Sequence, residues 1–420
     1  MKQTYTSRSR PAALLLLLLA LLTLLPGLPA AAEEEHDIRR ITISAVGDCT
    51  LGRSQKMDYF QSWNYLFDRK GSGYFLQNMK EIFQEDDLTI ANLEGILSDS
   101  AKRRRYFYRQ RQDRYQEKQY CHLGRPAYIT ALTEGGVDAV SFANNHNIDY
   151  GLQGFTDTVE TCALYGLPAA YYDTLVRCEV RGLTVGILSV DLTYCSLDIA
   201  ESYLRAGMAD LNRDCDLIVA CMHWGNNNEK QASGEQAAFG HLCVELGADL
   251  VLGCHAHVLQ GVERYKGRYI FYSLGNFCYG GNILLRDADT VIAQQTFTFV
   301  DGELQLDDAV RLIPCRVSTH EEYNDYCPVP LTGKEARRVL RKINTRSEAF
   351  GLRFDGKGRP KVEPAADTEL PPPVIAEEAL RAEEIPSIIR VLLGVEDAEI
   401  EQLREGSEPV FLYRMEETAG

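Results

Sequence analysis

The chain has 420 residues, of which 25% are charged, and a formal net charge of −16. This length is enough for one large domain with an extension, or for two domains. The excess of acidic residues disfavours attraction of the whole molecule to nucleic acid, and the sequence contains no nucleic-acid-binding motif, so we expect no nucleic-acid partner.

The first 32 residues have the pattern of an export signal. Basic residues at positions 2, 8 and 10 precede a leucine-rich run over 12–25, and small residues follow at 29–32. This order is typical of a secretory signal. The apolar run is short for a membrane span, so both cleavage and retention as an N-terminal anchor stay open. We expect an exported protein, either extracellular or membrane-anchored at the cell envelope.

Strand-like apolar runs alternate with helix-like segments from Ile41 to about Ile313. This alternation predicts an α/β domain, which we assign to residues 38–330. The pair Asp301-Gly302 predicts a hairpin, so the late part of the domain should be antiparallel and the sheets mixed. The predicted strands are Ile41–Val46, Leu88–Asn92, Ala139–Phe142, Thr184–Val190, Leu217–Met222, Leu250–Leu252 and Arg268–Tyr272.

Polar residues come directly after several of these runs. The carboxyl ends of buried strands are where α/β folds place ligands, and carboxylates, amide oxygens and imidazoles are metal-binding groups. Each residue also has a plainer interpretation, as a helix cap, a solvent-facing loop residue or a hydrogen-bonded structural histidine. In an extended chain, residues i and i+2 share a face, so His255 and His257 could serve one cluster. The candidate ligands are Asp48, Glu94, Asn145, His223, His255 and His257.

His146 follows one of these ligands directly and suits the role of general acid. Asp149 lies three residues further on and could orient the imidazole. The alternative is a pair of helix-capping asparagines beside a structural histidine. The remaining histidines at positions 122, 241 and 320 have no comparable setting, so we expect them to be structural or exposed.

A basic stretch begins at Lys102-Arg103-Arg104-Arg105 and continues to Arg114 with interleaved aromatic residues. It could attract an anionic polymer or a phosphate-bearing substrate. The plainer interpretation is a solvated loop or helix face.

Residues 331–420 are predicted to form a C-terminal extension of helices and linker. Lys334 to about Ser347 should be a helix, 356–373 is a Gly/Pro-rich linker, and 377–404 could form one or two helices. No chemical cluster lies after Ile313. The twelve cysteines show no repeated spacing, so we expect mostly free thiols.

Six motifs occur in order along the chain: Gly47–Arg53, Asn92–Gly95, Ala143–His146 with Asp149–Gly151, His223–Gly225, His255–Gln260 and Ser273–Phe277. Together they resemble the CapA-type capsule synthesis family, whose better known members act in poly-γ-glutamate capsule biosynthesis. This family looks like a branch of the calcineurin-like metallophosphoesterase superfamily. The resemblance spans roughly Ile41 to Pro330.

The resemblance implies a four-layer α-β-β-α sandwich with mixed sheets around a centre for one or two divalent metal ions, drawn from Mn, Fe, Zn or Mg. It would assign Asp48 and His257 to one metal, Asn145, His223 and His255 to the other, and Glu94 to the bridge. His146 would protonate the leaving group, with Asp149 beside it. Substrate-binding residues would be Arg53, Asn144, Trp224 and Asn276.

This chain departs from the superfamily pattern at Thr50, where a histidine is usual, and at Glu94, where Asp is usual. Loss of an imidazole should weaken the Asp48 site. The resemblance implies an exported protein that assists synthesis, export or processing of an anionic envelope polymer such as poly-γ-glutamate, with a metal-dependent hydrolytic centre and membrane-bound synthase partners. The alternatives are a general exported metallophosphoesterase acting on phosphorylated precursors, and a non-catalytic scaffold for a polymer synthase.

Overall fold

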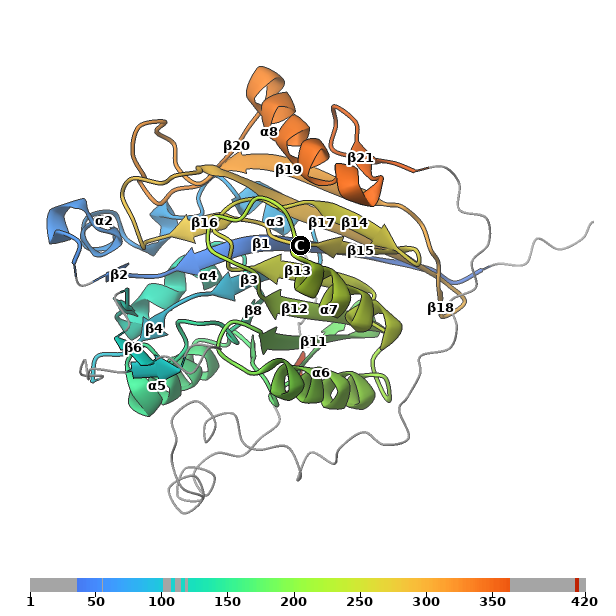
Figure 1. Ribbon diagram of the computed structural model, residues 1–420, viewed down its shortest axis with the longest axis horizontal. Helices are drawn as coiled ribbons and strands as arrows, with labels where there is room; N and C mark the ends of the chain where they lie inside the picture. The colour runs from blue at the N-terminus through green and yellow to red at the C-terminus, as the bar shows by residue number, and fades with distance from the viewer. Residues whose placement is uncertain are drawn as a thin grey trace, which may run out of the picture.

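Two β-sheets face each other across an apolar core in the computed structural model (Figure 1), which describes residues 36–54, 56–100, 107–109, 115–117, 120–362 and 412–414. The first sheet runs β20 (Val329–Pro330), β19 (Val310–Arg316), β17 (Asp289–Val300), β1 (Ile38–Thr50), β3 (Leu88–Leu93), β8 (Ala139–Ser141) and β9 (Ala169–Ala170), with β16 (Asn276–Tyr279) on β1 and β18 (Glu303–Leu304) on β17.

The second sheet contains the strands that follow in the middle of the chain. Its central strands are parallel, whereas β1 and β17 of the first sheet are antiparallel, so the sheets are mixed as predicted. Its order is β14 (Val262–Tyr265), β15 (Arg268–Phe271), β13 (Leu250–Cys254), β12 (Leu217–His223), β11 (Leu183–Asp191), β10 (Val176–Val180) and β23 (Leu412–Arg414).

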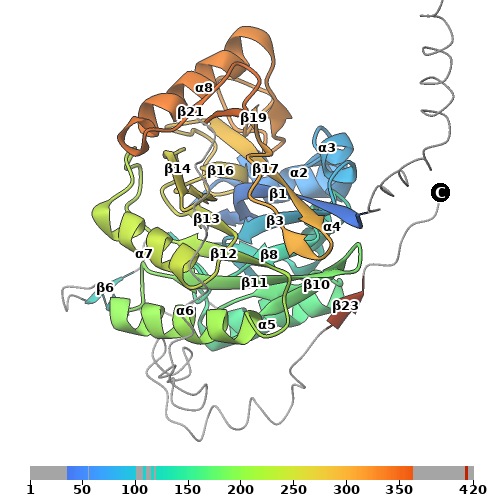
Figure 2. The same ribbon diagram turned by 90° about the vertical axis from the view of Figure 1, so that its right-hand side faces the viewer.

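Helices cover the outer face of each sheet, which completes the predicted α-β-β-α sandwich (Figure 2). Alternate residues of a strand point to opposite faces. In β12, Val219 packs in the core between the sheets, whereas Ala220 packs against the helices. The helices are α6 (Leu197–Leu211) and α7 (Gly234–Glu245) on the second sheet, and α2 (Trp63–Lys70), α3 (Lys80–Gln84), α4 (Thr130–Thr133) and α5 (Gly151–Leu164) on the first.

The helix predicted after residue 333 forms as α8 (Gly333–Arg346) and packs on β19. Its Val339, Leu340 and Ile343 belong to the core between the sheets. The hairpin predicted at Asp301-Gly302 also forms, since both residues have positive φ angles, 53° and 87°, between β17 and β18. Residues 356–362, predicted to begin the linker, instead form the turn and second strand of a hairpin between β21 (Arg353–Phe354) and β22 (Pro360–Lys361). The predicted leader, residues 363–373 and the helices predicted over 377–404 lie outside the described residues.

Short elements complete the fold. β2 (Arg53–Ser54), β7 (His122–Gly124) and β4 (Ile96–Leu97) form a three-stranded sheet, and β21 (Arg353–Phe354) pairs with β22 (Pro360–Lys361). β5 (Phe107–Arg109) pairs with β6 (Tyr115–Glu117), and most of the basic stretch around them is outside the described residues. Four 3-10 helices occupy Tyr59–Gln61, Ser72–Tyr74, Pro126–Ile129 and Glu348–Phe350.

An aspartate precedes several parallel strands and caps the neighbouring strand at its amino end. Its carboxylate accepts a hydrogen bond of 2.7–2.8 Å from a backbone N–H of that neighbour, and its own N–H donates to the carbonyl of the same residue. Each reciprocal pair of hydrogen bonds satisfies a backbone N–H and a backbone carbonyl that the hydrogen bonds between the strands leave without a partner. The pairs are Asp87 with Thr42, Asp138 with Thr89, Asp216 with Thr184, and Asp249 with Ile218.

All twelve cysteines are free thiols, as predicted, and all except Cys215 are buried. Burial raises the pKa of Cys49 and Cys254 well above the ordinary thiol value, and the carboxylates of Asp48 and Glu94 raise it further. These thiols therefore stay protonated and act as small apolar side chains. Within the described part of the chain, no helix has the length and apolar character needed to cross a bilayer.

Candidate metal centre

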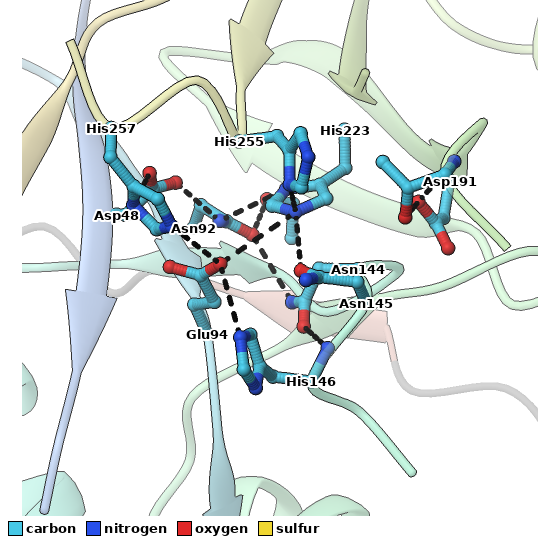
Figure 3. Close-up of polar contacts among 12 residues, drawn as sticks. Asp48, Asn92, Glu94, Asn144, Asn145, His146, Asp191, His223, His255 and His257 are labelled. Atoms are coloured by element: carbon cyan, nitrogen blue, oxygen red, sulfur yellow. Dashed lines mark hydrogen bonds and ion pairs between the residues drawn. The ribbon is translucent and has the colours of Figure 1, made fainter. Parts of the chain in front are cut away.

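The predicted ligands gather where the strands of both sheets end, at one end of the core between them (Figure 3). Two of them arrive by simple alternation. Cys221 and then His223 point inward from β12, and Ile90, Asn92 and Glu94 do so from β3. Alternate residues of each strand point into the core, and the polar residues at the end of the strand continue this alternation, so they point toward the centre.

Asp48 reaches the centre because β1 contains a bulge. Ala45 pairs with Ile90 and Asp48 pairs with Asn92, so three residues of β1 span two of β3. The extra residue reverses the alternation, and Cys49 instead of Asp48 faces the helices. Gly47 at the bulge lies against the chain near Gly275, whose carbonyl oxygen is 1.8 Å from where a Cβ would stand.

His255 and His257 come from the turn after β13. The expectation that this segment is extended is wrong, because both residues have positive φ angles, 94° and 56°. Such angles are strained for residues other than glycine and occur most often at functional sites. The turn places His257 in one ligand group and His255 in another, and the two groups share the carboxylate of Glu94.

The first ligand group consists of Asp48, Glu94 and His257. The Nδ1 atom of His257 lies 3.2 Å from Asp48 Oδ2, and its Nε2 atom lies 3.9 Å from Glu94 Oε1. Burial lowers the pKa of His257, but Glu94, Asp48 and the hydrogen bond to Asn276 outweigh it and raise this pKa to about 9. One candidate atom from each residue lies within 4.8 Å of the others, which suits one cation.

The second ligand group consists of Glu94, His223 and His255. His223 Nε2 lies 3.7 Å from Glu94 Oε1 and 3.1 Å from His255 Nδ1. Asn145 Oδ1 is 2.9 Å from the same His223 nitrogen. Glu94 is common to both groups, so its carboxylate stands where it could bridge two cations. A site that combines nitrogen and oxygen donors suits Zn, Fe or Mn better than a site of oxygen donors alone does.

His146 stands beside this cluster without belonging to either group. Its Nε2 atom is 4.0 Å from Glu94 Oε1, and its Nδ1 atom is 2.7 Å from Asp149 Oδ2. Both side chains are almost fully buried. A carboxylate at Nδ1 holds the proton there and points the other ring nitrogen at the cluster, as a general acid requires.

The four predicted substrate-binding residues have different surroundings. Asn276 Oδ1 is 2.9 Å from Nδ1 of His257. The side-chain Oδ1 of Asn144 accepts a hydrogen bond of 3.0 Å from the backbone N–H of His146. The Arg53 guanidinium donates to the Met57 carbonyl. Trp224 lies away from the cluster, since it packs in the core between the second sheet and its helices.

Sequence reasoning missed Asn92 and His122. Asn92 Nδ2 donates to Asp48 Oδ1 at 2.8 Å and lies 3.4 Å from His223 Nδ1, so it contacts a residue of each ligand group. Its place two residues before Glu94 on the same strand face was an available signal. His122, expected to be structural or exposed, is buried, and its ring centroid lies 4.5 Å from that of His146.

Known proteins with related sequences include two CapA proteins. The chain is 27% identical over 277 residues to the capsule biosynthesis protein CapA of Bacillus anthracis, covering 60% of this chain and 62% of that one. It is 24% identical over 258 residues to the PGA biosynthesis protein CapA of Bacillus subtilis, covering 57% and 63%. A probable polyglutamine synthesis accessory protein of Mycobacterium tuberculosis is 28% identical over 189 residues, 38% of this chain and 50% of that one. The chain thus spans less than two thirds of the length of these relatives.

Among solved structures, the 5'-nucleotidase of Candida albicans aligns over 75% of this chain and 59% of its own, at 10% identity and a TM-score of 0.40. The model of the bacterial capsule synthesis protein family, PGA_cap, matches residues 42–280, more than half of the chain and all six candidate ligands. The chain therefore belongs to the bacterial capsule synthesis protein family.

Proposed function

We propose that this protein acts in the synthesis, export or processing of an anionic envelope polymer such as poly-γ-glutamate, and that its centre is a metal-dependent hydrolase. The observation that supports the proposal most directly is the sharing of Glu94 by two ligand groups, with His146 next to it. The names of the Bacillus relatives support the polymer. Membrane-bound synthase partners and export are parts of the same proposal.

Bound divalent cations would polarise the scissile group and activate a water molecule. Asp48, Glu94, Asn145, His223, His255 and His257 would hold them. The other contributions come from the protein itself. Asp149 accepts the Nδ1–H of His146 and stabilises the imidazolium form of its ring, whose Nε2–H would give its proton to the leaving group. Asn92 keeps Asp48 and His223 in place through its amide group.

The test compares metal content and hydrolysis for the natural protein, His223→Ala, His146→Ala and the control His241→Ala. His241 lies outside the cluster, on α7, and bonds to Glu263. His223→Ala should lower metal affinity about 10-fold or more. His146→Ala should keep the metal and lose turnover. His241→Ala should change neither property.

Substrates should include poly-γ-glutamate and a chromogenic phosphate ester, each with added Mn²⁺ or Zn²⁺. Cleavage of the polymer supports the proposed role, whereas turnover of the ester alone supports a general metallophosphoesterase. Full polymer production by cells that carry His146→Ala would contradict a hydrolytic role and support a scaffold. Fractionation addresses export, and a cytoplasmic protein with residues 1–32 intact would contradict that part.

A further inference from the structure

We propose that His122 is a positioning residue that holds the proton donor His146 in place. The proposal rests on the hydrolytic function proposed above and adds a residue that lies outside the six motifs. His122 is the first residue of β7 in the three-stranded sheet, where it pairs with Ser54 of β2. The small sheet therefore brings a histidine from a distant part of the sequence to the metal centre.

The backbone of His122 fixes the carboxylate that orients His146. Its N–H donates to Asp149 Oδ2 at 2.7 Å, and the same oxygen lies 2.7 Å from His146 Nδ1. The carboxylate oxygen thus joins the chain at β7 to the imidazole of the proton donor. The pairing of β7 with β2 and β4 on either side keeps this N–H from moving.

The ring of His122 restrains the His146 ring directly. The two centroids are 4.5 Å apart with a tilt of 55°, and the His122 side chain is 3% exposed. On its other side, the Cβ of His122 lies 3.2 Å from where a side chain on Gly95 would begin, and Gly95 follows Glu94 directly. The His122 side chain therefore fills the space between the ring of His146 and the turn at Gly95, which follows the shared carboxylate of Glu94.

These contacts predict a role that depends on ring volume. With His122→Ala, the backbone N–H remains but the ring is lost, so His146 gains room to rotate away from the leaving group. A misplaced catalytic group costs about 10- to 100-fold in rate, and kcat should fall by that factor with little change in KM. A phenyl ring keeps a flat ring in the same place, and swaps that conserve volume are tolerated best, so His122→Phe should keep kcat within about 3-fold of the natural value.

The experiment measures kcat, KM, metal content and thermal stability for His122→Ala, His122→Phe, His146→Ala and the control His241→Ala. His241 also packs against an aromatic ring, with its ring centroid 3.8 Å from that of Tyr265. Its replacement should leave kcat unchanged. All variants should keep their metal, because His122 belongs to neither ligand group.

A second readout does not depend on activity. Nitrogen-labelled histidine should give a downfield Nδ1–H resonance for the His146–Asp149 hydrogen bond, assigned by its absence from His146→Ala. The resonance should persist in His122→Phe and broaden or disappear in a folded His122→Ala protein. An unchanged resonance and unchanged kcat in His122→Ala would overturn the proposal, as would equal damage in both His122 variants. If His146→Ala itself keeps full turnover, the hydrolytic function fails, while the resonance still tests the positioning.

Discussion

Replacement of Asp138 tests the capping aspartates at the amino ends of the strands. Burial raises the pKa of Asp138 to about 6, although the hydrogen bond from the Thr89 N–H opposes the rise. In the unfolded chain the pKa is about 3.9. The folded state therefore binds the proton more tightly. The stability that this proton provides is complete below pH 4 and is lost as the pH rises through 6.

Two pKa units correspond to about 3 kcal/mol, an upper bound because the side chain is only partly buried. Asp138→Asn removes the charge but keeps an oxygen for Thr89. It should match the natural protein near pH 4 and exceed its unfolding free energy by up to about 3 kcal/mol above pH 7. Asp138→Ala leaves the Thr89 N–H without its acceptor, so it should lose about 1–3 kcal/mol relative to Asp138→Asn at every pH.

Urea denaturation at pH 3, 4, 6 and 8 measures these differences. The control Asp355→Asn should behave in the opposite way, since backbone hydrogen bonds from Arg359 and Lys357 lower the Asp355 pKa. Asp355→Asn should lower the unfolding free energy at neutral pH. This loss should become smaller as the pH falls below about 3.9, the carboxyl pKa of the unfolded chain, and through the lower pKa of the folded state. A stability difference between Asp138→Asn and the natural protein that does not change with pH would refute the reasoning.

Three further predictions concern the chain around the centre. Gly47→Ala should lower the unfolding free energy by about 1–3 kcal/mol and reduce the metal content, because the new Cβ meets the Gly275 carbonyl. The control Gly234→Ala places its Cβ where no atom lies within 4 Å, so it should change neither property in the same denaturation and metal assays. Arg346→Met removes a buried hydrogen bond to the Leu259 carbonyl, so it should lower the unfolding free energy by about 1–3 kcal/mol. The control Arg337→Met, on the exposed side of α8, should have almost no effect. Equal losses of unfolding free energy in the two variants would contradict this account. A chain ending at residue 362 should bind as much metal as the full chain, since every ligand lies between residues 48 and 257, and a folded truncated protein without metal would show the prediction to be wrong.

The sequence predicted an α/β domain with mixed sheets because apolar alternation and turn residues are local signals, whereas the four-layer sandwich was implied by the resemblance to the family. The sequence also indicated Glu94 and His223, since each continues the inward face of a strand by simple counting. Asp48 was proposed for its position after a strand, but its direction depends on the bulge, and a period of two counted from Ile43 would have turned it outward. No local pattern reports a bulge, because the extra residue is defined by pairing with β3.

His122 shows the other limit of sequence reasoning. Its neighbours in the chain give no chemical hint, and its contact with His146 depends on a small sheet assembled from three separate segments. Trp224 illustrates the reverse case. It follows a ligand in sequence, but alternation places it on the helix side of the sheet. Adjacency in a strand therefore indicates opposite faces more often than a common site.

The capping aspartates also set a constant interval along the chain. Glu94 lies seven positions after Asp87, as do Asn145 after Asp138 and His223 after Asp216. His255 and His257 lie six and eight positions after Asp249, on either side of the same interval. The capping aspartate fixes the amino end of each strand, and the number of residues that follow determines which face of the sheet the ligand side chain occupies. A single inserted or deleted residue inside an interval would turn the ligand toward the helices. Length variation in relatives should therefore be confined to the loops beyond the ligands, while these four intervals keep their length even where the sequence inside them diverges.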